Sequence, residues 1–259
     1  MGDEDSFGHL SFCSEQSSGR VLRFRAVKYH VRRVAAFELV IFDCDGVLVD
    51  SEQIANDVFV EQMAELGLRL DTRQAFTEFV GTSWAHCSRV VEQRLGRPLP
   101  STFLQEHFDR CRGRMERELL PVPGVAAVVT GLDCLKCVAS NGEIAKMRMT
   151  LGITGLLPLF EGALFSATEV AAGKPDPDVF LWAARTMGVD PGRVAVVEDT
   201  VAGVTAGVRA GMTVFGYTAT MGHDRLAAAG AHVLINDMSQ LLRLLASHPI
   251  VGTGVTLPS

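Results

Sequence analysis

The sequence lacks a long hydrophobic run: no stretch reaches about 18 consecutive apolar residues, the length that crosses a bilayer, so a membrane span is excluded. Basic residues are not in excess either. The 24 Lys and Arg stand against 30 Asp and Glu, and a net charge of −6 argues against nucleic acid as the main partner. Cysteine is sparse, with 6 scattered residues, so we expect reduced thiols in a cytoplasmic protein rather than a disulfide framework.

What is present is an ordinary globular composition, 47% hydrophobic and 21% charged, in 259 residues, enough for one or two domains. Both ends differ from the rest of the chain. Residues 1–36 combine an acidic, Ser-rich start with a basic stretch at 20–33, and the early acids fit no targeting pattern. We interpret 1–36 as a poorly ordered extension and 248–259 as a loose tail.

From Phe37 onward, short and nearly continuous apolar runs alternate with helical patterns. Runs of this kind are typical of parallel strands that are covered on both faces. The expected strands are 38–43, 136–140, 163–166, 193–198, 212–216 and 232–235. The expected helices of this part are 142–151, 178–187, 201–210 and 225–229. Together they predict an α/β fold built on a doubly wound parallel sheet.

One interval breaks this alternation. Between the first two expected strands lie far more residues than a crossover helix needs. Residues 53–120 carry helical patterns and no convincing strand, and the helices are expected at 53–66, 72–79, 85–95 and 101–119. We interpret 53–120 as an inserted all-helical cap domain, which divides an α/β catalytic core into 37–52 and 121–247. The insertion leaves the sheet at the edge where open α/β sheets bind ligands.

Acidic residues end two of the expected strands. The first strand ends in the sequence DCDG, in which Asp43 and Asp45 point the same way if the strand continues, and repel each other unless a cation lies between them. The fourth ends in Glu198 and Asp199. Four such acids at one sheet edge suit Mg²⁺. An ordinary acidic surface turn is the alternative, but it does not explain why acids follow buried apolar runs.

Two further strand ends suit an anion. Ser140 and Asn141 precede an expected helix, where a hydroxyl and free N–H groups form an anion site, although the same residues could simply cap the helix. Lys174 follows the third strand in a loop stiffened by two prolines and could supply a fixed positive charge, whereas a lone loop lysine is more often solvated. All these side chains are expected to converge on one edge of the sheet.

The segments FDCDGVLVDSE, VASNG, GKPDPDVF and VVEDTVAGVTAG resemble, in the same order, the four motifs of the haloacid dehalogenase superfamily. The resemblance covers about residues 37–245, and the inserted helices are similar to the cap of the phosphatase and β-phosphoglucomutase branch. It implies that Asp43 is the nucleophile and Asp45 the general acid/base. It implies that Ser140, with Asn141, and Lys174 hold the phosphoryl group. The implied Mg²⁺ ligands are Asp43, the carbonyl oxygen of Asp45, and Asp199, with Glu198 assisting.

The resemblance implies a Mg²⁺-dependent hydrolase of a small phosphorylated metabolite, a sugar or sugar-acid phosphate, acting through an aspartyl-phosphate intermediate. A β-phosphoglucomutase-type phosphohexomutase is the alternative. The mutase pattern has an Arg three residues after a cap Gly, and this chain has Trp84 three residues after Gly81. The mutase pattern also has a His after the first motif, and this chain has Ala55 at that position. Both departures favour hydrolysis. Candidate specificity residues are Gly81, Thr82 and Trp84, and the Trp84 ring either stacks on a substrate or packs between cap helices.

Other classes fit less well. The resemblance implies that the dehalogenases of this superfamily lack an acid two residues after the nucleophile, where this chain has Asp45. Phosphate-accepting signalling domains do not need an inserted cap, and this chain has one. The spacing of Cys111 and Arg117 formally matches a cysteine-phosphatase loop, but the surrounding sequence reads as one amphipathic helix. Cys134 and Cys137 lead into an apolar strand, so core thiols are favoured over a redox pair. A monomer or weak dimer, with no macromolecular partner, is expected.

Overall fold

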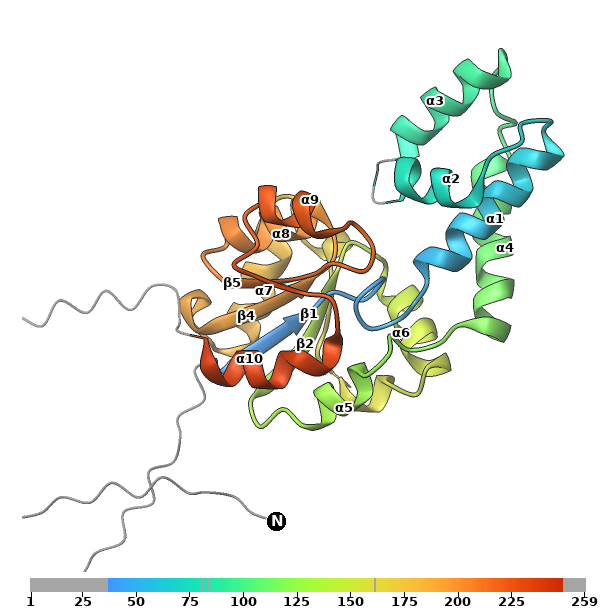
Figure 1. Cartoon of the computed structure of the whole chain (residues 1–259). Helices are drawn as coiled ribbons and strands as arrows, with labels where there is room; N and C mark the ends of the chain where they lie inside the picture. The colour runs from blue at the N-terminus through green and yellow to red at the C-terminus, as the bar shows by residue number, and fades with distance from the viewer. Residues whose placement is uncertain (1–36, 81, 83, 161, 249–259) are drawn as a thin grey trace, which may run out of the picture. The chain divides into compact units, whose positions relative to one another are not determined.

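The structure is a computed structural model that describes residues 37–80, 82, 84–160 and 162–248 (Figure 1). The expected extension at 1–36, the specificity candidate Gly81 and the expected tail beyond His248 lie outside the described residues. The strands are β1 (Leu39–Phe42), β2 (Leu135–Ser140), β3 (Leu164–Ser166), β4 (Val194–Glu198), β5 (Thr213–Tyr217) and β6 (Val233–Ile235). The α-helices are α1 (Glu52–Glu65), α2 (Thr72–Phe79), α3 (Trp84–Leu95), α4 (Phe103–Glu118), α5 (Val125–Thr130), α6 (Ile144–Ile153), α7 (Asp178–Met187), α8 (Val201–Arg209), α9 (His223–Ala228) and α10 (Leu241–Ser247). Short 3₁₀ turns are η1 (Leu157–Leu159), η2 (Ala167–Glu169), η3 (Pro191–Arg193) and η4 (Met238–Gln240).

The six strands form one parallel sheet in the order β3-β2-β1-β4-β5-β6. Each expected strand forms within one residue of its expected ends. Strand β1 lies between β2 and β4, with Phe42 in register with Val138 and with Val197. The strand order reverses between β1 and β4, and such a switch point is where open α/β sheets bind their ligands. In Figure 1 the arrow of β1 points toward the connection that leads into α1.

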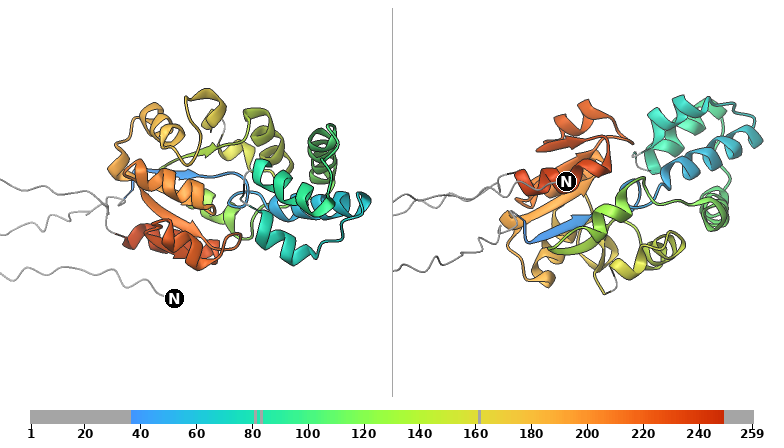
Figure 2. Two further views of the ribbon diagram at one scale, coloured as in Figure 1. Left: turned by 90° about the horizontal axis from the view of Figure 1, so that it is seen from above. Right: turned by 60° about the horizontal axis from the view of Figure 1, so that its bottom comes forward.

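Helices cover both faces of the sheet, as Figure 2 shows, which confirms the doubly wound fold. Successive residues of a strand point to opposite faces. Leu39 and Ile41 therefore belong to a buried cluster with α7, α8 and α9, whereas Val40 and Phe42 belong to one with α5, α6 and α10. All four side chains are fully buried, which explains the continuous apolar run.

Helices α1 to α4 form an insertion between β1 and α5 that has its own hydrophobic cluster. Surface ion pairs also link α4 to α1: Arg110 pairs with Glu65, and Arg114 pairs with Glu61. The insertion is therefore a helical unit attached to the sheet, as the inserted-cap fold requires. The buried members of its cluster are Phe59, Met63, Ala75, Phe79, Cys87, Val91 and Phe103.

The two connections between this insertion and the sheet are hydrogen-bonded to each other. The Asp50 N–H donates to the Leu120 carbonyl at 3.0 Å, and the Val122 N–H donates to the Leu48 carbonyl at 3.0 Å. The insertion is thus anchored at the carboxyl end of β1. Within the described part of the chain, no helix combines the length and apolar character that spanning a membrane would need.

Candidate active site

Lys174 and Asp43 form the centre of the site. Asp43 directly follows β1, and its N–H donates to the Val197 carbonyl of β4 at 3.0 Å. The Lys174 ammonium donates to Asp43 Oδ1 at 2.5 Å, to Glu198 Oε1 at 2.7 Å and to the Ala139 carbonyl at 2.9 Å. Its side chain is only 3% exposed. The alternative of a solvated loop lysine is therefore wrong, and Lys174 is a fixed buried charge.

The electrostatics of this pair reflect burial and charge together. Burial raises the pKa of Asp43 to about 7, with the charge of Glu198 adding to the shift and Lys174 opposing it. Burial alone would lower the pKa of Lys174, but the two carboxylates reverse this and raise it. The ammonium also lies 4.8 Å from the centre of the Phe180 ring. Lys174 thus stays charged, whereas Asp43 needs further positive charge to be fully ionised at neutral pH.

Three carboxylates converge beside Lys174. One oxygen from each of Asp43, Glu198 and Asp199 lies within 4.8 Å of the others, and all three residues are buried. Both oxygens of Asp199 are buried, and neither makes a hydrogen bond of ordinary geometry among the described residues. Burial, then the charges of Glu198 and Asp43, raise the pKa of Asp199 well above its ordinary value, and the nearby Thr220 hydroxyl only partly offsets this rise. An unpartnered buried carboxylate among two others is what a divalent cation would stabilise, and oxygen donors suit Mg²⁺.

Glu198, at the end of β4, is held by residues on both of its oxygens. Lys174 binds Oε1, while the N–H and the hydroxyl of Thr200 both donate to Oε2 at 2.9 Å. The Thr200 hydroxyl also accepts from the Gly203 N–H at 3.0 Å and so caps α8. A Cβ atom at Gly203 would lie 1.8 Å from Glu198 Oε1, so this helix passes close to the carboxylate only because position 203 is Gly.

Asp45 turns its carboxylate away from the acidic trio. Ser51 donates to its Oδ1 at 2.6 Å, and Lys146 of α6 donates to its Oδ2 at 2.8 Å. Burial would raise the pKa of Asp45, but Lys146 and Ser51 outweigh burial and lower it. Of the four acids expected at this sheet edge, three bring their carboxylates together, and that of Asp45 does not join them. The implied contact of the Asp45 carbonyl oxygen with Mg²⁺ stays a prediction. Lys146, Ser51 and Thr200 are site residues that the sequence analysis missed.

Ser140 and Asn141, at the end of β2, complete the inner surface. The buried Ser140 hydroxyl accepts from the Gly142 N–H at 3.1 Å. Asn141 accepts from the Lys174 N–H at 2.9 Å and donates to the Lys174 carbonyl at 3.2 Å, so its amide ties the loop after β2 to the lysine. Neither residue caps α6, whose N-cap is Glu143. The site therefore combines a hydroxyl, a buried cation and three acids at one sheet edge.

The cap candidates lie within the helical insertion. The Trp84 ring stacks on Phe103 at 5.7 Å and on His107 at 5.6 Å between ring centroids. The Thr82 hydroxyl donates to the Phe79 carbonyl at 2.7 Å. Of the two roles considered for Trp84, packing between cap helices is the one its contacts fit.

The remaining candidates are structural. Cys111 lies within α4 and is buried, so its surroundings are helical and not a phosphate loop. Burial raises the pKa of Cys111 to about 11, which keeps it a thiol. Cys134 and Cys137 are free thiols, and Cys137 is fully buried.

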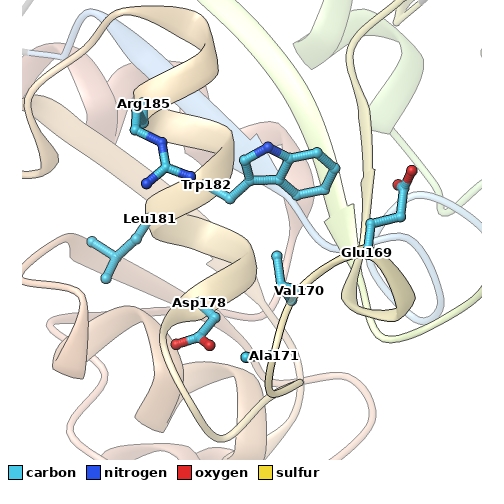
Figure 3. A pocket seen from close by; sticks show the side chains of 7 residues that line it. All are labelled: Glu169, Val170, Ala171, Asp178, Leu181, Trp182 and Arg185. Carbon is cyan, nitrogen blue, oxygen red and sulfur yellow. The ribbon is translucent and has the colours of Figure 1, made fainter.

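A surface cavity of about 400 Å³ lies elsewhere, between α7 and the loop that follows β3, as Figure 3 shows. The Trp182 ring of α7 points toward Val170 and Glu169 of the loop there, and Arg185 lines the cavity from the same helix. None of the residues that line this cavity is one of the site residues described above. It is therefore separate from the carboxylate cluster.

Comparisons with known proteins agree with this arrangement. A family model described as haloacid dehalogenase-like hydrolase matches residues 37–211. The chain is 34% identical over 187 residues to 6-phosphogluconate phosphatase of Escherichia coli, which covers 72% of this chain and 85% of that protein. It is similar in structure to a haloacid dehalogenase-like protein of unknown function from Agrobacterium tumefaciens, with a TM-score of 0.76 and 37% identity over 81% of this chain and 98% of that chain. It is also similar to a hydrolase of the same family from Deinococcus radiodurans with bound phosphate and sodium, with a TM-score of 0.71 and 30% identity over 83% and 99% of the two chains.

Proposed function

Since this chain belongs to the haloacid dehalogenase-like hydrolase family and is a hydrolase of phosphomonoesters, we propose that it acts on a small phosphorylated metabolite with Mg²⁺ as its cofactor. The substrate class is a sugar phosphate or a sugar-acid phosphate. The observation that carries the proposal is the contact of Lys174 with Asp43 beside the acidic trio. The relative with 34% identity is a phosphatase of 6-phosphogluconate, which supports this substrate class. The relative from Deinococcus radiodurans has bound phosphate, which supports a phosphate site but no particular leaving group.

In the proposed reaction Asp43 is the nucleophile. An Asp43 oxygen attacks the phosphorus in line, the ester bond to the leaving oxygen breaks, and an aspartyl phosphate forms. Lys174 and Ser140 hold the phosphoryl oxygens, and the buried ammonium reduces the repulsion between the anionic carboxylate and the anionic phosphate. Water then attacks the phosphorus of the intermediate, which releases phosphate and regenerates Asp43.

Asp45 is the proposed general acid and base. It gives a proton to the leaving oxygen in the first step and takes one from the attacking water in the second. Because Lys146 and Ser51 lower the pKa of Asp45 in the free protein, the first step requires these contacts to loosen when the substrate binds. Asn141 contributes as a positioning residue, because it holds the backbone of Lys174 on both sides.

Asp43, Asp199 and the Asp45 carbonyl oxygen are the proposed Mg²⁺ ligands, with Glu198 assisting. The unpartnered oxygens of Asp199 support a cation at this position. When bound, Mg²⁺ supplies positive charge that favours the ionised carboxylates and offsets the charge of the phosphate.

Hydrolysis is favoured over the mutase alternative. A mutase must hold a second phosphate while the sugar turns over, and this calls for a cation in the cap. Trp84 stands where the mutase pattern has its Arg, and it packs on Phe103 and His107. Ala55 stands where the mutase pattern has its His, and it packs against the hydrophobic core. Neither position offers a charge to a second phosphate.

That the protein is a monomer or weak dimer stays a prediction.

Steady-state phosphate release from an aryl phosphate, with Mg²⁺ or with EDTA, tests the proposal. We expect turnover that requires Mg²⁺ and that falls by more than about a thousandfold in Asp43→Asn. Asp224→Asn, at an exposed residue of α9, is the matched control and should keep full activity. A phosphorylated protein without turnover would indicate a signalling domain instead. Conversion of β-glucose 1-phosphate to glucose 6-phosphate in the presence of its bisphosphate activator, without free phosphate, would establish the mutase.

A further inference from the structure

A second lysine contacts the motif that contains Asp43, at Asp45. Lys146, in the first turn of α6, donates to Asp45 Oδ2 at 2.8 Å, and its side chain is 42% exposed. Lys174, by contrast, is 3% exposed and contacts three acceptors within 2.9 Å. Lys174 is therefore fixed on the phosphoryl side, whereas Lys146 reaches solvent and can exchange its partner.

The surroundings of Lys146 are otherwise acidic. Glu52, the first residue of α1, is half-buried, and its pKa rises to about 7 because of burial and then the charge of Asp45, with Lys146 opposing the shift. Asp50 adds a further negative charge near Glu52. An anionic leaving group that enters beside Asp45 would be repelled by these carboxylates unless a cation met it there. Lys146 is the cation that the structure holds against Asp45.

We propose that Lys146 is a specificity-determining residue that binds a carboxylate on the leaving group, so that the preferred substrates are phosphate monoesters of sugar acids. The inference rests on the proposed function, in which Asp45 contacts the ester oxygen and Lys146 therefore lies on the leaving-group side. A lysine is a compact charge on a flexible stem with three donors, so it can bind a substrate carboxylate in place of, or together with, Asp45.

The energy of the existing contact permits this exchange. The pair is exposed on the lysine side, where 42% of the Lys146 side chain is accessible, whereas the Asp45 side chain is 19% exposed. Water therefore screens the ammonium and can replace Asp45 as its partner. A Cβ atom at Gly142 would lie 3.8 Å from Lys146 Cδ and 3.9 Å from Asp45 Oδ2, which is ordinary van der Waals contact. The residue at position 142 therefore does not obstruct a movement of the lysine stem.

Two matched substrates test the inference. The 6-phosphate esters of gluconate and of glucitol share the phosphate and the hydroxyl chain, and differ only in a terminal carboxylate against a terminal alcohol. We expect the wild-type protein to prefer the acid in kcat/KM. Lys146→Gln should lower kcat/KM for the acid about 10- to 100-fold more than for the alcohol, mainly through KM, because any effect that acts through Asp45 is common to both esters.

Two control variants and an aryl phosphate define the outcome. Arg148→Gln removes an exposed positive charge from the same helix and should leave the preference for the acid unchanged. Lys146→Arg keeps the positive charge and should retain that preference. An equal loss for both esters in Lys146→Gln would overturn the inference, because Lys146 would then act only by positioning Asp45. So would a wild-type protein without preference for the acid. If the wild-type protein turns over an aryl phosphate but neither ester, the inference fails while the proposed chemistry stands. If it turns over none of the three, the proposed function itself fails.

Discussion

The carboxylate of Asp199 lies against Gly46: a Cβ atom at position 46 would lie 2.0 Å from Asp199 Oδ2. This is well inside van der Waals contact. Gly46 also has a φ of +77°, a left-handed conformation that glycine adopts without strain. The turn after β1 and the end of β4 thus approach each other so closely that any side chain at position 46 would clash with the Asp199 carboxylate.

Gly46→Ala should therefore displace Asp199. We expect Mg²⁺-dependent phosphatase activity to fall at least about a hundredfold, together with a stability loss above the roughly 1–2 kcal/mol of left-handed strain. Gly96→Ala is the matched control, because Gly96 has a φ of +67° but open space around its Cβ position. That variant should lose free energy of unfolding in urea, because of the backbone strain, and should keep its phosphatase activity. Equal losses of activity in the two variants would contradict the close approach of Asp199 to position 46.

Asp199→Asn should separate metal binding from folding. Removing one charge from three clustered carboxylates should stabilise the metal-free protein, because the Asp199 carboxylate is buried without a hydrogen-bond partner among the described residues. The wild-type protein should gain about 2.7 kcal/mol at a Mg²⁺ concentration of about 100 Kd, or several degrees in Tm. The variant should gain almost nothing. Thermal unfolding in EDTA and in Mg²⁺ measures both effects, and an undiminished Mg²⁺ shift in the variant would place the ion elsewhere.

The two lysines of the site should differ in their contribution to stability. Lys174→Met leaves Asp43 and Glu198 buried without their common partner, which should cost about 3–5 kcal/mol. Lys146→Met breaks a pair in which only the lysine is exposed, and Asp45 keeps its contact with Ser51, so the loss should be smaller, about 1–2 kcal/mol. Urea unfolding of both variants in EDTA gives the comparison directly. Similar losses would mean that the burial of Lys174 has little energetic consequence.

Much of the core could be predicted from the sequence because its signals are local. Continuous apolar runs identify strands that are buried on both faces, and parallel strands bring their carboxyl ends to one edge. This was sufficient to expect Asp43, Glu198 and Asp199 to lie together, as they do. The helices α5 and α10, of 6 and 7 residues, are too short for a clear helical period and were missed, although the equally short α9 was expected at 225–229.

The contacts that were missed depend on tertiary structure. Nothing local indicates that the Asn141 amide holds Lys174, which lies 33 residues further along the chain. The same is true of Lys146 and Asp45, separated by 101 residues. The contact between Thr200 and Glu198 could have been predicted from the sequence. A Thr before an expected helix is a common N-cap, and Glu198 lies only two residues before it.

His107 should make the stability of the protein depend on pH. It is buried in the helical insertion, its Nδ1 lies 2.8 Å from Gln62 Oε1, and its ring stacks on Trp84. Burial lowers the pKa of His107 to about 4 from an ordinary value of 6.5. Between these two values the unfolded chain binds a proton that the folded protein excludes. Stability should therefore fall as the pH decreases from 6.5 toward 4, by at most about 1.4 kcal/mol per pH unit from this residue.

Urea unfolding of the wild-type protein and of His107→Phe, at several pH values between 4.5 and 7.5, measures this contribution. Other groups also titrate over this range, so the quantity that matters is the difference between the two proteins at each pH. The variant loses the hydrogen bond to Gln62 at every pH, which lowers its stability by a constant amount. Because Phe does not titrate, that gap should narrow as the pH falls below 6.5. A gap that stays constant would mean that the folded insertion accepts a protonated His107, and that the ring is more accessible to water than its packing indicates.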